Sequence, residues 1–185
     1  KHKMLLYQLL KAPIQLILVL PCILVSLTFH EWAHGYAAYK CGDMTAKMYG
    51  RLSLNPLAHL DPVGSVCMLL FGFGWAKPVP VDMRNFKNPK RGMAITALAG
   101  PVSNLILTAL FLVLYGGLYY PLYLMGGAVG HFIMQLILVT AYLSLSLAVF
   151  NLIPISPLDG SKVLFAFLSD EAYYKLMRYE RYGMI

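Results

Sequence analysis

Two histidines and a glutamate stand together in a long apolar stretch, in the order His30, Glu31, Trp32, Ala33, His34. Residues four apart project from the same face of a helix, so both imidazoles can bind one metal ion. Glu31 lies about 100° further around the helix, where its carboxylate can act as a general base. The pattern predicts a hydrolytic zinc site. Two core histidines that hydrogen-bond to neighbouring helices are the alternative interpretation.

A catalytic zinc ion needs a third protein ligand and keeps a fourth position for water. Ten other side chains are candidates, most of them in charged loops or tails: His2, His59, His131, Asp43, Asp61, Asp82, Asp159, Asp170, Glu171 and Glu180. Asp159 differs because it follows an apolar segment that Pro154 and Pro157 interrupt, and Gly160 lets the backbone turn after it. Asp159 is the leading candidate. Capping of a helix that begins at Ser161 is its alternative role.

The composition is that of a membrane protein. Of 185 residues, 59% are hydrophobic and 12% are charged, whereas soluble domains carry about 25% charged residues. Three apolar stretches are long enough to span a bilayer, at 12–39, 93–114 and 131–152. We expect a turn rich in Gly and Tyr between the last two. Residues 62–76 are apolar but short, which favours a re-entrant segment.

The basic residues indicate the orientation. The fifteen Lys and Arg side chains, with a net charge of +7, lie in loops between the apolar stretches. This distribution favours a membrane surface over a nucleic acid as the partner. Cytoplasmic loops carry the excess of Lys and Arg, so we place the loop 77–91 and the C-terminal tail in the cytoplasm. We therefore expect an integral protein of the cell membrane with its active site near the cytoplasmic face.

We predict an all-α polytopic membrane protein with a three-helix catalytic core, a re-entrant segment and a minor β element. The β element is expected at residues 45–54 and 76–83, where Pro78 and Pro80 prevent a helix. An unwound substrate could pair with the edge at residues 78–81. We expect one integral-membrane domain over residues 1–185, in a sequence trimmed at one or both ends.

The motifs resemble those of the site-2 protease family of intramembrane zinc metalloproteases. H-E-x-x-H at 30–34 and N-x-x-P-x-x-x-x-D-G at 151–160 carry the resemblance, with the segments 50–64, 73–86 and 100–104. The resemblance implies that His30, His34 and Asp159 bind zinc and that Glu31 is the general base. It also implies that Asn151 helps hold the substrate backbone or the developing oxyanion. The compact branch of the family is the best match, and neither a PDZ nor a CBS module is expected.

The resemblance implies a zinc endopeptidase that hydrolyses a peptide bond in or near a transmembrane segment of another membrane protein. Its partners would be that substrate and the lipid bilayer, and its oligomeric state is left open. A membrane zinc transporter and a catalytically inactive scaffold of the same fold are the alternatives. A transporter needs a chain of polar sites through the membrane, and this sequence has very few.

Overall fold

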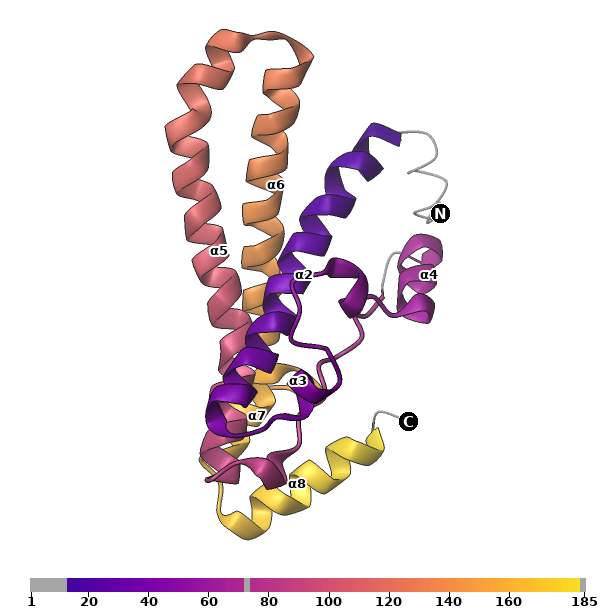
Figure 1. The fold of residues 1–185 in the computed structure, drawn as a ribbon, viewed down its shortest axis with the longest axis vertical. Coiled ribbons are helices and arrows are strands. Elements are labelled where there is room, and N and C mark those ends of the chain that lie inside the picture. The colour runs from indigo at the N-terminus through magenta and orange to yellow at the C-terminus, as the bar shows by residue number, and fades with distance from the viewer. Residues whose placement is uncertain (1–12, 72–73, 184–185) are drawn as a thin grey trace. The chain divides into compact units, whose positions relative to one another are not determined.

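The fold consists of helices joined by loops. The computed structural model describes residues 13–71 and 74–183. Along the chain the elements are α2 (Pro13–Cys41), α3 (Thr45–Met48), the 3-10 helix η1 (Pro56–His59), α4 (Pro62–Phe71), the 3-10 helix η2 (Met83–Asn85), α5 (Pro89–Met125), α6 (Gly127–Asn151), α7 (Asp159–Phe165) and α8 (Asp170–Gly183) (Figure 1). Within these ranges there is no strand. The all-α prediction is confirmed.

The predicted minor β element is reduced to one antiparallel bridge, between Leu60 and Ala76. The expectation of an extended stretch at 45–54 is wrong, because its first residues form α3. Met44 holds the N-cap position of that helix, and the Asp43 carboxylate accepts a hydrogen bond from the Thr45 N–H. Residues 77–82 are not helical, as their two prolines require.

Three helices are long and apolar enough to cross a membrane, and they lie at Ile17–Cys41, Pro89–Met125 and Gly127–Asn151. The three predicted spans are therefore confirmed as helices, and the one over 93–114 is longer than expected. Apolar side chains such as Ile106, Leu110 and Val113 of α5 are exposed in the isolated chain. Exposed apolar surface of this extent is suited to lipid contact. The chain is an integral membrane protein.

The predicted Gly- and Tyr-rich turn between the second and third spans is wrong in its extent. The chain stays helical through Gly116, Gly117 and Pro121 and breaks only at Gly126, where it and Gly127 have positive φ of 62° and 67°. Three tyrosines spaced four apart, at 115, 119 and 123, contact one another along one face of α5. Such contacts one turn apart support a helix despite its glycines.

The chain forms two compact units, each assembled from three separate stretches. Among described residues, the first unit comprises 13–28, 54–71 with 74–78, and 105–145. Small polar groups join its helices. Ser26 and Ser144 share a hydrogen bond of 2.8 Å, and the Thr108 hydroxyl donates to the Ala141 carbonyl at 3.3 Å. The re-entrant placement of its α4 stays a prediction.

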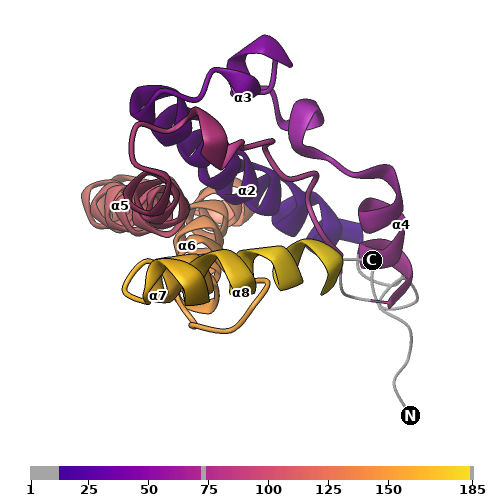
Figure 2. The ribbon, with the colours of Figure 1, turned by 90° about the horizontal axis from the view of Figure 1, so that it is seen from below.

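The second unit comprises residues 29–53, 79–104 and 146–183 of the described chain. Ala38, Phe86 and Met93 form its small apolar core. The buried Asp43 carboxylate accepts hydrogen bonds from the Asp82 N–H and the Asn85 side chain, and so ties the α2–α3 turn to η2. At the other end of the chain, α7 leads into α8 (Figure 2).

Candidate metal centre

His30 and His34 lie one turn apart in α2, in the second unit. Their rings are buried and meet edge to face, with centroids 4.6 Å apart. The spacing of four residues puts both side chains on one face of the helix, as the sequence pattern predicts. The pair therefore presents two ring nitrogens to the same small volume.

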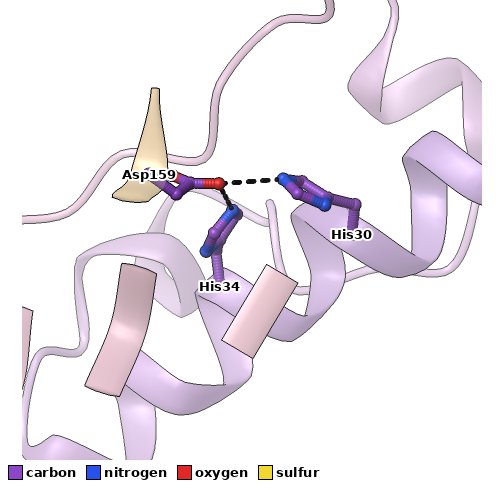
Figure 3. Close-up of side chains that lie close together, drawn as sticks. All are labelled: His30, His34 and Asp159. Atoms are coloured by element: carbon purple, nitrogen blue, oxygen red, sulfur yellow. Dashed lines mark hydrogen bonds and ion pairs between the residues drawn. The ribbon is translucent and has the colours of Figure 1, made fainter. Parts of the chain in front are cut away.

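Asp159 meets this pair from the start of α7. Its Oδ2 lies 3.1 Å from His30 Nε2 and 3.2 Å from His34 Nε2, so the three side chains point toward one another (Figure 3). The three candidate ligand atoms lie within 4.8 Å of one another. Asp159 is the first residue of α7 and does not cap a helix at Ser161, since Leu158 holds the N-cap position. The capping alternative is therefore wrong.

The turn that delivers Asp159 depends on Gly160. A Cβ on Gly160 would lie 2.6 Å from the carbonyl carbon of Leu152 and 2.7 Å from the carbonyl oxygen of Ile153. The chain thus folds tightly back onto the residues that follow α6, and only glycine fits there. Burial by itself would raise the pKa of the Asp159 carboxyl. The interactions of Asp159 with the His30 and His34 rings outweigh burial and hold that pKa well below its usual range.

Helix α5 orients both imidazoles from the opposite side. His34 Nδ1 lies 2.7 Å from the Thr96 carbonyl oxygen, and His30 Nδ1 lies 3.2 Å from the Asn104 side-chain nitrogen. Gly100 lies midway between these residues, and a Cβ there would be 2.5 Å from His34 Cε1. Thr96, Gly100 and Asn104 are spaced four apart, so one face of α5 packs on both histidines.

The donor set fits a zinc ion. A carbonyl oxygen can only accept, so the Thr96 contact places the hydrogen of a neutral His34 on Nδ1. In that state His34 Nε2 faces Asp159 Oδ2 with its lone pair, an arrangement that a cation shared by the two acceptors would stabilise. Ligand atoms around tetrahedral zinc with bonds of 2.0–2.1 Å lie roughly 3.3 Å apart. The separation of 3.2 Å between His34 Nε2 and Asp159 Oδ2 is close to that spacing.

Glu31 and Asn151, the two predicted catalytic residues, lie in the same unit as the three ligands. Glu31 Oε2 accepts a hydrogen bond of 2.9 Å from the Val79 N–H, which comes from the extended stretch after Pro78. The Asn151 side-chain amide donates to the Leu147 carbonyl in its own helix, at 2.9 Å. Val79 was expected to pair with substrate, whereas its N–H contacts the candidate base.

Most of the remaining candidate ligands have structural partners. Asp61 caps α4 through a 2.7 Å hydrogen bond from the Gly64 N–H. Asp82 pairs with Arg84, whose hydrogen bonds lower the pKa of Asp82 to about 2. Asp170 pairs with Lys90. Of the other candidates, Asp43 lies at the α2–α3 turn, His59 is buried, and His131 and Glu171 are exposed. His2 and the side chain of Glu180 lie outside the part of the chain that the structure describes.

Sequence reasoning did not find the contacts of α5 with the histidines. The Asn104 side chain contacts His30 on α2. The Thr96 contact comes from the backbone, which leaves no mark on the residue type. The available signal was the regular placement of Thr96, Gly100 and Asn104 within an apolar helix. Two imidazoles and a carboxylate, held by a chain whose helices can cross a membrane, are a donor set suited to a metal ion in a membrane protein.

Comparison with known proteins identifies the family. The model of peptidase family M50 matches residues 118–180. The protein named "Putative zinc metalloprotease YwhC" of Bacillus subtilis (strain 168) is 43% identical over 165 residues, which are 88% of this chain and 74% of that protein. "Putative zinc metalloprotease Rip2" of Mycolicibacterium smegmatis is 30% identical over 174 residues, covering 91% of this chain and 64% of that protein. No solved structure matches the chain.

The chain belongs to peptidase family M50. Membership confirms the resemblance to site-2 proteases and the prediction of a zinc metalloprotease. The matched stretch 118–180 includes Asn151 and Asp159, while the alignment with the Bacillus protein extends over most of the chain. A protease acts on a protein substrate, so the coarse prediction of a protein partner also holds.

Proposed function

We propose that this chain is an intramembrane zinc endopeptidase, folded as one integral-membrane domain, that cleaves a peptide bond in or near a transmembrane segment of another protein. The observation that carries the proposal is the meeting of His30 Nε2, His34 Nε2 and Asp159 Oδ2 beside helices long enough to span a bilayer. A transmembrane segment of another protein shares the bilayer with these helices and can therefore approach the site.

His30 and His34 would hold zinc through their Nε2 atoms, and Asp159 would hold it through a carboxylate oxygen. When bound there, zinc acts as a Lewis acid that polarises the scissile carbonyl and makes water a better nucleophile. The other ring nitrogens contact α5. Such outer contacts fix the orientation of a ligating imidazole.

Glu31 would act as the general base. It takes a proton from the attacking water and later gives it to the leaving amine. The Val79 N–H holds one carboxylate oxygen, so the other oxygen is left for proton transfer. The carboxylate is half-buried, which limits competing water around it.

Asn151 would bind the substrate backbone or the developing oxyanion. A side-chain amide has two N–H donors and one carbonyl acceptor. One donor is used within α6, in the bond to the Leu147 carbonyl. The second donor suits a carbonyl oxygen of the substrate, where charge develops during attack.

The position of the motif along its helix supports a site near the cytoplasmic face. Cys41 ends α2 only seven residues after His34, which is about 10 Å of helix. The chain from α6 to Asp159 begins where α6 ends, at Asn151. Lys90 and Arg91 stand at the start of α5, whose next turns contact the histidines, and basic residues mark the cytoplasmic side.

The decisive experiment compares the native chain with Glu31→Gln. Both are co-expressed with candidate single-span membrane proteins and are then purified for metal analysis. We expect Glu31→Gln to keep its zinc, because Glu31 is not a ligand, and to lose 10²- to 10⁴-fold in cleavage rate, as is typical of a general base. Near-native cleavage by Glu31→Gln would remove Glu31 from the mechanism.

Asp159→Ala tests the third ligand, with Asp61→Ala as its matched control. We expect Asp159→Ala to lose zinc and cleavage, while Asp61→Ala keeps both because its carboxylate caps α4. Retention of stoichiometric zinc by Asp159→Ala and loss by Asp61→Ala would reverse the assignment. Zinc flux into liposomes without any cleavage would instead favour a transporter.

A further inference from the structure

The side-chain amide of Asn104 contacts the candidate ligand His30 on the ring nitrogen that faces away from Asp159. Asn104 is completely buried in α5, and its Nδ2 lies 3.2 Å from His30 Nδ1. On the other side of the ring, His30 Nε2 lies 3.1 Å from Asp159 Oδ2. His30 is therefore contacted at both ring nitrogens, and the two contacts depend on each other through the single hydrogen of a neutral imidazole.

The two histidines differ in what holds them. His34 Nδ1 faces a backbone carbonyl, which can only accept, so its hydrogen position is fixed. His30 Nδ1 faces an amide, which has a donating NH₂ end and an accepting carbonyl end of nearly the same shape. A half turn of the side chain about its Cβ–Cγ bond exchanges these ends. The hydrogen position on His30 therefore follows the orientation of the Asn104 amide.

Only one orientation is compatible with a metal ligand. If the NH₂ end donates to Nδ1, the hydrogen is on Nε2, where it is donated to Asp159 and leaves no lone pair for an ion. If the carbonyl end accepts from the Nδ1 N–H, the Nε2 lone pair is available. In the structure the NH₂ end contacts Nδ1. In that orientation the hydrogen of a neutral His30 is on Nε2, which donates it to Asp159.

We propose that Asn104 is a positioning residue of the metal centre. Its side-chain carbonyl accepts the Nδ1 hydrogen of His30 in the metal-bound protein. Asn104 thereby does for His30 what the Thr96 backbone does for His34. This inference rests on the proposed zinc function of the same site.

Two variants of Asn104 separate an accepting role from simple packing. Asn104→Asp keeps the shape but can only accept, so we expect zinc affinity within tenfold of the native chain. Asn104→Leu fills the space without any polar group, so we expect affinity to fall 10- to 100-fold, the usual effect of losing an outer-shell partner. Affinity is measured on detergent-purified protein by competition with a zinc chelator. The visible absorption spectrum of the Co²⁺-loaded protein reports the ligand geometry independently of activity.

Ser103→Ala is the matched control. The Ser103 hydroxyl also links α5 to α2, through the Phe29 carbonyl at 3.3 Å, and its other hydrogen-bond partner is the Gly100 carbonyl in its own helix. We expect zinc affinity within twofold of native for Ser103→Ala. An equal loss in Ser103→Ala and Asn104→Leu would mean that helix packing, and not the amide, supports the site, and would overturn the proposal.

The Asp variant decides between the two ends of the amide. If Asn104→Asp folds and loses as much affinity as Asn104→Leu, the NH₂ end is the important one and the proposal is wrong. If Asn104→Asp does not fold, as judged by the melting temperature of the zinc-free protein, Asn104→Leu decides: native affinity overturns the proposal and a tenfold loss supports it. A native chain that binds no zinc would instead refute the proposed function, so the two failures are distinguishable.

Discussion

Gly100 is the position where one added methyl group should disrupt the candidate metal centre without changing any ligand. A Cβ built there lies 2.5 Å from His34 Cε1 and 2.8 Å from His30 Cε1, and it is also too close to His34 Nε2. Ordinary van der Waals contact begins near 3.4 Å. In Gly100→Ala, the His34 ring must therefore move by about 1 Å or α5 must retreat by as much.

Neither movement is compatible with the intact site. His34 is held on its other side by the Thr96 carbonyl, which belongs to the same helix that would have to retreat. A shift of about 1 Å is half the length of a zinc–nitrogen bond, and misplacement by that distance can cost 10²-fold in rate. We expect Gly100→Ala to lose at least tenfold in zinc affinity and about 10²-fold in cleavage.

The control comes from the same helix. A Cβ at Gly116 or Gly117 of α5 meets no atom within 4 Å, and Ala is favoured over Gly in a helix by about 1 kcal/mol. Gly116→Ala and Gly117→Ala should therefore keep zinc and cleavage and melt at the same or a higher temperature. The assay is zinc content after dialysis against a chelator, with cleavage of a membrane-protein reporter. Native zinc content and turnover in Gly100→Ala would refute the close packing of α5 on the two histidines.

Three further predictions concern other parts of the mechanism and fold. Burial alone would raise the pKa of Asp43, but the hydrogen bonds that its carboxylate accepts hold that pKa below its ordinary value. The ionised carboxylate therefore stabilises the fold fully above a pH of about 4, and this stabilisation is lost as the pH falls through the lowered pKa. Asp43→Asn turns an NH₂ group toward buried donors and should reduce the free energy of unfolding by about 1–3 kcal/mol. We expect the melting temperatures of the native chain and Asp43→Asn to converge as the pH falls below the lowered pKa of Asp43. The exposed Asp170→Asn should show no such difference from the native chain. Val79→Pro removes the N–H that donates to Glu31 and should lower turnover about tenfold with the zinc content unchanged. Val79→Ala keeps this N–H and should therefore keep its turnover. Faster turnover in Val79→Pro would mean that the N–H hinders the base. In a reporter substrate, replacing Gly, Pro or Asn near the cleaved bond by Leu should slow cleavage by roughly tenfold per 1.4 kcal/mol of added helix stability; equal rates would indicate a substrate that is already extended.

The local parts of the fold and of the candidate site were predictable from the sequence. The spacing of His30 and His34 determines a shared face on any helix, whatever surrounds it. Apolar length alone determined that α2, α5 and α6 could span a bilayer. Asp159 was singled out by its prolines and glycine, which act on the backbone within a few residues of it.

The parts that failed depend on side-chain contacts that the residue types alone did not reveal. Thr45 was expected in an extended stretch, whereas it begins α3 and its N–H donates to the Asp43 carboxylate. The glycines at 116 and 117 were interpreted as a turn, yet tyrosines spaced four apart support the helix through them. The edge at 78–81 was expected to receive substrate. Pro78 and Pro80 carry no N–H, and that of Val79 contacts Glu31, so at most Val81 of these four residues can donate to a substrate strand.

The contacts that orient the two histidines of the metal centre also determine the register of α5 against α2. His30 contacts Asn104 and His34 contacts Thr96, so the two helices run in opposite directions at the site, with Gly100 opposite both rings. A slip of α5 by one residue would rotate its face by about 100° and remove all three contacts. A slip by one turn, about 5.4 Å, would restore the face but would bring the side chain of Thr96 or Asn104 into the space that only Gly100 leaves open. A small residue between two polar ones at this spacing therefore specifies a single register, and that register is the one that aims both Nε2 atoms at Asp159.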